Sequence, residues 1–137
     1  MITVALRPEI KGGVSGYPFL CCYPEAMQML RSYPYDELNC YARAYPGRAS
    51  EMMETLRYFD VVNFASWIKC PMAVGIALED EICPPETSYA AYQAIAGPKD
   101  LWLFPDSGHG NAHDYPAKET EWLERQIDLT NPGGADD

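Results

Sequence analysis

The chain has 137 residues, of which 47% are hydrophobic, and this length and composition fit one globular domain rather than a disordered segment. Its 20 acidic and 10 basic residues give a formal charge of −10, which argues against binding to nucleic-acid phosphates or to anionic lipid. Residues 1–8 lack a basic region followed by a long apolar stretch, so we expect neither a signal peptide nor a membrane span. We expect residues 1–130 to form the domain and residues 131–137 to form a flexible tail.

Five cysteines also bear on the class of protein. They are Cys21, Cys22, Cys40, Cys70 and Cys83. Their number is odd, and none of them has the spacing of a zinc site. We therefore expect buried free thiols in a reducing, cytoplasmic compartment, and no metal ion.

Four segments in the first 45 residues have the pattern of a regular element. An apolar stretch before Pro8 is too short for a stable helix by itself, and we interpret it as the end of a longer one. A glycine-rich stretch closed by Pro18 predicts a strand packed closely beneath a helix. The expected elements are the helix end Ile2–Leu6, the strand Ile10–Tyr17, and helices at Pro24–Arg31 and Tyr35–Ala44.

A further helix is expected to begin at Ser50, whose hydroxyl can cap the first turn. Apolar residues follow it at helical spacing, and we interpret them as a stripe that faces the core. The stripe consists of Met52, Met53, Leu56 and Phe59.

Strands and helices alternate in the second half of the chain. Met72–Leu78 is a continuous apolar run, which is typical of a strand buried on both faces of a parallel sheet. Such alternation calls for crossover connections, so we predict an α/β fold with about three parallel strands and flanking helices. The other expected elements are a helical turn at Asn63–Trp67, a helix from Pro84 to about Ala96, a strand at Leu101–Phe104, and a helix at Tyr115–Leu129 with Trp122, Leu123, Gln126, Ile127 and Leu129 on its inner side.

An acid and a histidine follow two successive predicted strands. Asp80 comes two residues after Met72–Leu78, and His109 comes after Leu101–Phe104. The carboxyl ends of parallel strands form the ligand-binding edge of such a sheet, and the α/β-hydrolase triad runs serine, acid, histidine along the chain. In that triad the histidine takes a proton from the serine, and the carboxylate holds the imidazole. We predict Asp80 and His109 as the catalytic acid and base.

Other assignments remain open on the residues alone. Glu79 or Glu81 could replace Asp80 as the acid, and His113 could replace His109. Cys83 lies near Asp80 and could act as a thiol nucleophile, but we interpret it as a loop or packing residue.

Ser15 is the serine with the most suggestive surroundings. The segment Gly13-Val14-Ser15-Gly16-Tyr17 has tyrosine where a Gly-x-Ser-x-Gly motif has its last glycine. We expect it within a strand rather than on a strand-to-helix turn, which gives Ser15 a structural role.

Several segments resemble, in the right order and spacing, the acetyl xylan esterase and cephalosporin C deacetylase family. The resemblance covers about residues 5–128. The segments that carry it are Pro18-Phe19-Leu20-Cys21, residues 33–38, residues 59–65, Ile68-Lys69-Cys70-Pro71, Asp80-x-x-x-Pro84-Pro85-Glu86-Thr87, Ala90-Ala91-Tyr92 and Ser107-Gly108-His109.

The resemblance implies the C-terminal part of an α/β-hydrolase fold. The family consists of serine esterases that remove acetyl groups from xylan, acetylated oligosaccharides and cephalosporin C, and Asp80 and His109 match its triad acid and base. No metal or organic cofactor is implied. The chain departs from the family in three ways: it lacks the serine elbow, it lacks the loop that completes the oxyanion hole, and Gly110 stands where a glutamate usually follows the histidine.

The function predicted from these patterns is that of a fragment of a serine carboxylic-ester hydrolase, inactive alone because the nucleophile is missing. Its parent would act on an acetylated small molecule or oligosaccharide. The alternative is a non-enzymatic binding or assembly module. Because family members are oligomers and the strand at Gly12–Tyr17 would have an open edge, we expect a homo-oligomer or a partner chain covering that strand.

Overall fold

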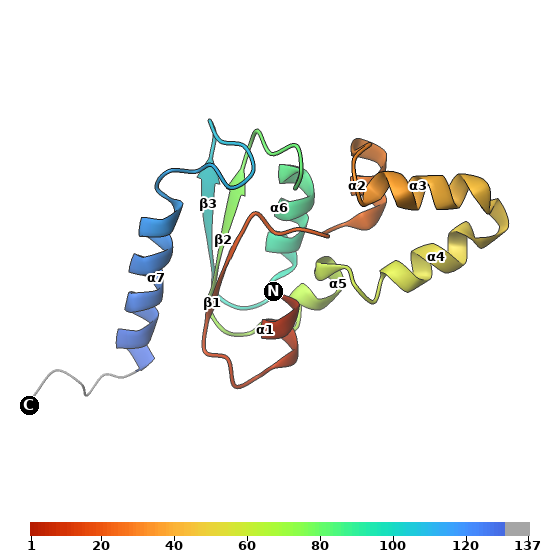
Figure 1. Ribbon diagram of the computed structural model, residues 1–137. Helices are drawn as coiled ribbons and strands as arrows, with labels where there is room; N and C mark the ends of the chain where they lie inside the picture. The colour runs from red at the N-terminus through yellow and green to blue at the C-terminus, as the bar shows by residue number, and fades with distance from the viewer. Residues whose placement is uncertain (131–137) are drawn as a thin grey trace, which may run out of the picture.

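The protein is described here by a computed structural model, which covers the backbone of residues 1–130 and the side chains of residues 1–127. Three parallel strands form one sheet in the order β1-β2-β3 (Figure 1). Their bounds are Gly13–Gly16 for β1, Met72–Ala77 for β2 and Lys99–Phe104 for β3. The prediction of about three parallel strands is therefore confirmed. The predicted tail, residues 131–137, lies outside the described residues.

Helices cover both faces of the sheet. Helix α6 packs on β2, with α5 and α1 beside it, and α7 lies against the opposite face near β1 (Figure 1). The helices are α1 (Ile2–Leu6), α2 (Tyr23–Met29), α3 (Tyr35–Ala44), the 3-10 helix η1 (Pro46–Arg48), α4 (Ala49–Leu56), α5 (Val61–Ala65), α6 (Pro85–Ala94) and α7 (Tyr115–Thr130). No helix in the described part of the chain is long and apolar enough to cross a membrane.

The strand register places three loops at one edge of the sheet. Gly16 of β1 lies opposite Gly75, and Ala77 of β2 lies opposite Phe104. Since all three strands run in the same direction, the segments that follow them, residues 17–22, 78–84 and 105–114, meet at the carboxyl edge.

The core is built around β2, in which every residue is buried, as predicted for a strand covered on both faces. The α6 side of the sheet holds an aliphatic cluster, and the α7 side holds an aromatic one. The aliphatic cluster comprises Ala65, Ile68, Met72, Val74, Ile76 and Ile95. The aromatic side comprises Ala77, Phe104 and Ala112, with Tyr17, Trp102 and Tyr115 packed against them.

Two glycines make room for an aromatic ring on the α7 side. A Cβ atom at Gly16 would lie 2.6 Å from the Tyr115 ring, and one at Gly75 would lie 3.0 Å from it. The Tyr115 ring therefore packs directly on the backbone of β1 and β2. This close approach confirms that glycines in this region serve packing beneath a neighbouring helix.

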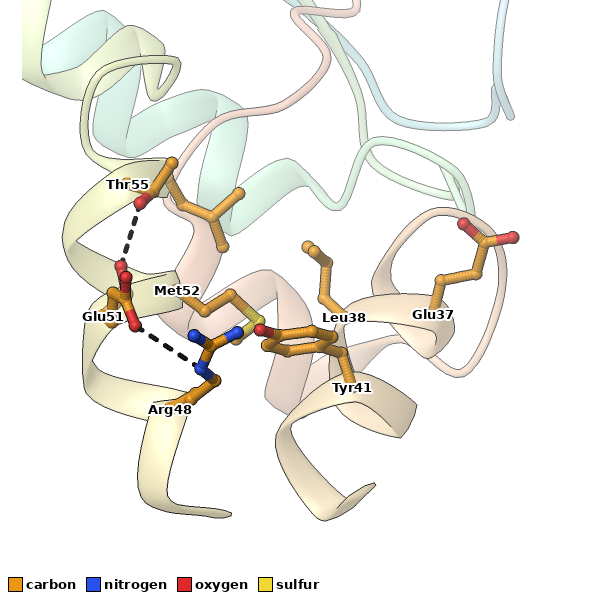
Figure 2. A pocket seen from close by; sticks show the side chains of 8 residues that line it. Glu37, Leu38, Tyr41, Arg48, Glu51, Met52 and Thr55 are labelled. Atoms are coloured by element: carbon orange, nitrogen blue, oxygen red, sulfur yellow. Dashed lines mark hydrogen bonds and ion pairs between the residues drawn. The ribbon is translucent and has the colours of Figure 1, made fainter. Parts of the chain in front are cut away.

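Helices α2, α3 and α4 form an arm that projects away from the sheet (Figure 1). The arm has a small core of its own, formed by Tyr23, Ala26, Met27 and Tyr35, with Leu20, Leu30, Leu38, Met52, Met53 and Leu56 packed against it. A groove of about 350 Å³ runs between α3 and α4. Figure 2 shows Tyr41, Leu38 and Met52 in it, near the Arg48–Glu51 ion pair of 3.9 Å.

The buried carboxylate of Asp60 joins the arm to the rest of the protein. Its Oδ1 accepts the N–H groups of Cys22 and Val62 at 2.9 and 3.0 Å, and its Oδ2 accepts the N–H of Tyr23 at 2.9 Å. Asp60 thus caps α5 and at the same time satisfies the start of α2. One side chain fixes two helices that are distant in sequence.

Several expected boundaries and buried faces differ from the structure. Helix α4 begins at Ala49, so Ser50 lies inside its first turn and the prediction that Ser50 caps it is wrong. Helix α5 begins at Val61 because Asp60 caps it, two residues before the predicted turn. Strand β1 is shorter than the predicted Ile10–Tyr17.

Three residues predicted to face the core are exposed. Phe59 follows the end of α4, where the chain turns out of the stripe, and 59% of it is exposed. Leu123 and Ile127 are exposed on α7, whereas Trp122 is buried as predicted. Helix α7 contacts β1 of the sheet, and Trp122 is the residue of the predicted stripe that is buried there.

Candidate active site

Asp80 lies at the carboxyl end of β2, where the chain turns into α6. Its carboxylate is buried, and Oδ1 accepts two backbone N–H groups, from Ile82 and Cys83, both at 2.8 Å. Its second oxygen, Oδ2, lies 2.9 Å from Nδ1 of His109. Hydrogen bonds to ionised oxygens are the stronger kind, so this turn holds a carboxylate in one orientation.

His109 lies in the loop that follows β3, with 39% of its side chain exposed. The loop is joined to the exit of β2 because the Glu79 N–H donates to the Ser107 carbonyl at 3.0 Å. It then turns at Gly110, whose φ is +70°. With Nδ1 directed at Asp80, the Nδ1–H tautomer leaves the lone pair of Nε2 available, and this nitrogen can accept a proton.

Asp80 and His109 are 29 residues apart in sequence and form a hydrogen-bonded pair in space. An acid that orients a partly exposed imidazole is the arrangement of a general base. The structure brings the two predicted residues together; their catalytic roles stay a prediction.

The structure does not bring the alternative residues to this pair. Glu79, Glu81 and His113 are exposed, and none of them is hydrogen-bonded to the pair among the described residues. Ser15 lies within β1, opposite Val74, rather than on a turn. No hydroxyl of the described residues makes a hydrogen bond to His109.

Sequence reasoning missed Tyr17, which lies beside the pair. Its ring centroid is 5.6 Å from that of His109, and its hydroxyl accepts the N–H of Ala112 at 3.2 Å. The available signal was its place directly after β1, at the same carboxyl edge as Asp80 and His109. The glycine-rich segment before Tyr17 indicated Ser15 as the candidate residue instead.

A third group near the pair is the thiol of Cys83. Asp80, Cys83 and His109 each place one potential metal-ligand atom within 4.8 Å of the others, the only such group among the described residues. Burial, and then the charge of Asp80, raise the pKa of Cys83 to about 12. A protonated thiol is a poor metal ligand and a poor nucleophile, and both Asp80 oxygens already have hydrogen-bond partners. The geometry favours an acid–histidine pair over a metal centre.

Cys83 is expected to resist alkylation at pH 8, because a thiol with a pKa of about 12 is about 10⁻⁴ thiolate at that pH. Iodoacetamide should modify the exposed Cys40 at least about 100-fold faster than Cys83, as peptide mass spectrometry can measure. The rate at Cys83 should rise about tenfold per pH unit until the pH nears 12. The urea-unfolded chain, in which both thiols are accessible, is the control. Equal alkylation rates of Cys40 and Cys83 in the folded chain at pH 8 would mean that the Cys83 thiol is ionised, and would favour a metal centre.

All five cysteines are free, as expected. The expectation that they are buried holds for Cys21 and Cys83, whereas Cys40 is exposed on α3 and the other two are partly buried. Burial, and then the charge of Asp60, raise the pKa of Cys21 to about 12. The thiols in the interior therefore act as small apolar packing groups.

Comparison with known proteins identifies the family. The sequence pattern of the acetyl xylan esterase family matches residues 1–126. This chain belongs to the acetyl xylan esterase family. The acetyl esterase Axe7A of Xylanibacter ruminicola is similar to it, with 28% identity over 127 residues, which are 93% of this chain and 28% of that protein.

Solved acetyl xylan esterases share the fold. Those from Paenibacillus sp. R4 and Thermoanaerobacterium sp. JW/SL YS485 are 34% and 32% identical to this chain, and both superpose with a TM-score of 0.81. The match covers 89% and 90% of this chain and 40% of each of those chains. The chain thus spans less than half the length of these relatives. The prediction that it forms part of an α/β-hydrolase fold is confirmed.

Proposed function

We propose that this chain supplies the acid and the base, Asp80 and His109, of a serine acetylesterase. The observation that carries the proposal is the 2.9 Å contact between Asp80 Oδ2 and His109 Nδ1 at the carboxyl edge of the sheet. No Gly-x-Ser-x-Gly segment occurs in the 137 residues. The nucleophile and the donors of the oxyanion hole are therefore proposed to come from polypeptide outside this sequence.

The chemistry follows from the orientation of the imidazole. Nε2 of His109 takes the proton of the serine hydroxyl as the serine oxygen attacks the acetyl carbonyl, and Asp80 stabilises the imidazolium that forms. The imidazolium then gives its proton to the departing alcohol, which leaves an acetyl-serine. In the second half, His109 takes a proton from water as the water oxygen attacks the acetyl carbonyl, and the serine then leaves with that proton, releasing acetic acid, which ionises to acetate.

Acetylated carbohydrates are the proposed substrates. Relatives named for acetyl xylan and acetyl esterase activity support this class, and the resemblance to cephalosporin C deacetylases extends it to acetylated small molecules. The formal charge of −10 suits a neutral substrate better than a polyanion. The free thiols support a reducing, cytoplasmic location, again as a proposal.

The open edge of β1 favours an additional partner. Strand β1 pairs only with β2, so its other edge is unpaired among the described residues. Unpaired edges accept a further strand. We propose that the strand at Gly12–Tyr17 is covered by the rest of the hydrolase fold or by a second copy of the chain. A non-enzymatic assembly module would use the same edge.

Hydrolysis of 4-nitrophenyl acetate by the purified chain tests the proposal. The chain and its Asp80→Asn, His109→Ala and Ser15→Ala variants are all expected to hydrolyse it at the background rate, because loss of the nucleophile alone costs about 10⁶ in rate. Activity lost in Ser15→Ala would make Ser15 the nucleophile. Activity that survives Ser15→Ala but is lost in His109→Ala would point to a nucleophile within the chain that we have not assigned, and would also overturn the proposal.

A further inference from the structure

We propose that Tyr17 is a positioning residue for His109: its ring and its hydroxyl together hold the imidazole in line with Asp80. The inference rests on the proposed function for its catalytic meaning. The effect of Tyr17 on the geometry of the acid–histidine pair depends only on its contacts with residues distant in sequence, His109 and Ala112.

The backbone at Tyr17 is constrained in an unusual way. Its N–H donates to the Gly75 carbonyl at 2.9 Å, so the residue still extends the pairing of β1 with β2. Its φ is nevertheless +49°, and Leu20 and Cys22 also have positive φ. A bulky residue in this region is strained, and such strain persists where the surrounding structure imposes it. The chain therefore leaves the sheet at Tyr17 by a sharp turn rather than by continuing the strand.

The Tyr17 ring contacts both the aromatic residues on the α7 side of the sheet and the imidazole of His109. Its centroid lies 5.5 Å from the Tyr115 ring and 6.4 Å from the Phe104 ring, and these rings support it from the sheet side. The His109 ring lies 5.6 Å from it at an interplanar angle of 55°. The imidazole thus contacts the Tyr17 ring and is hydrogen-bonded to the Asp80 carboxylate.

The hydroxyl of Tyr17 fixes the second end of the loop that carries His109. The first end is held at Ser107, whose carbonyl accepts the Glu79 N–H at 3.0 Å. The second end is held at the buried Ala112, whose N–H donates to the Tyr17 hydroxyl at 3.2 Å. His109 lies between these two anchors, on a loop that otherwise has the freedom of Gly110. Loss of the second anchor should loosen the loop at Ala112, while the ring of Tyr17 still holds the imidazole.

Nuclear magnetic resonance of the 137-residue chain tests this without any ester hydrolysis. The chain has two histidines, so a His113→Gln variant assigns the imidazole signals. In the wild-type chain we expect a downfield Nδ1–H signal from His109, protected by its bond to Asp80. Tyr17→Phe keeps the ring and removes the hydroxyl. Tyr17→Asn removes the ring, and asparagine tolerates positive φ, so the backbone turn is preserved.

Tyr17→Phe is expected to keep the His109 Nδ1–H signal and to speed hydrogen exchange of the Ala112 amide about tenfold, the equivalent of one ordinary hydrogen bond. Tyr17→Asn is expected to lose the Nδ1–H signal. The control Tyr115→Phe removes the neighbouring hydroxyl, which bonds Glu119 instead, and should change neither readout. If the Nδ1–H signal is retained in Tyr17→Phe and lost in a folded Tyr17→Asn, the ring of Tyr17 positions His109, and a general loss of structure is excluded.

A wild-type Nδ1–H signal that persists unchanged in Tyr17→Asn would overturn the proposal, as would its absence from the wild-type chain. If Tyr17→Asn fails to fold by circular dichroism, an unchanged Ala112 exchange rate in Tyr17→Phe would overturn it, and the expected tenfold change would support it. The ester assays judge the hydrolase proposal separately. A positioned His109, in a chain whose ester hydrolysis is lost in Ser15→Ala, would contradict only the proposed function.

Discussion

Joined to the part of the Paenibacillus sp. R4 esterase that it does not match, this chain is expected to hydrolyse 4-nitrophenyl acetate, and His109→Ala is expected to remove that activity. Loss of the base should lower kcat by about 10⁶, because the serine then has no group to take its proton. Asp80→Asn should lower kcat by about 10⁴, because an amide cannot hold the required imidazole tautomer. Both values are measured against the joined protein with the wild-type sequence of this chain.

Matched variants keep this prediction specific. His113→Ala and Glu79→Gln change the exposed residues nearest in type and sequence, and each should retain kcat within about threefold. The second histidine and the flanking acid were the alternatives that the sequence left open. Should Glu79→Gln lower kcat as much as Asp80→Asn, the acid has been assigned to the wrong carboxylate, whatever the hydrogen bond at 2.9 Å suggests.

Asp60→Ala is expected to lower the free energy of unfolding by about 3 to 5 kcal/mol, because three backbone N–H groups then lose their partner at a buried site. Domains of this size are stable by about 5 to 15 kcal/mol, so the variant would lose much of its stability. Urea unfolding of the 137-residue chain, followed by circular dichroism, measures the change.

Two controls test the reason for that loss. Asp60→Asn keeps one oxygen but presents an amide nitrogen to a backbone donor, so it should cost less, about 1 to 2 kcal/mol. Asp36→Ala removes a half-exposed carboxylate whose one ion pair among the described residues, with Arg43, is 3.9 Å long, and it should cost less than about 0.5 kcal/mol. If Asp60→Ala and Asp36→Ala lowered the free energy of unfolding equally, the hydrogen bonds of Asp60 to α2 and α5 would contribute no more to stability than a half-exposed carboxylate does.

Local patterns were sufficient for the regular part of this fold. The apolar run at residues 72–78 predicted a fully buried strand because a strand covered on both faces needs no polar residues. The helix Tyr35–Ala44 was predicted with its observed bounds. Asp80 and His109 were identified because parallel strands bring their carboxyl ends to one edge whatever the length of chain between them.

Other features depend on contacts that no local pattern contains. Tyr17 meets Ala112 across 95 residues, and Asp60 meets Tyr23 across 37, so neither role is visible in the residues beside them. Phe59 continues a helical stripe in sequence, but the helix has already ended and the side chain is exposed. The sequence by itself determined the α/β class and the acid–histidine pair, because these follow from periodicity and strand direction. The tertiary structure alone decided which side chains hold that pair and the arm in place, because their partners are brought near only when the sheet and the helices have packed.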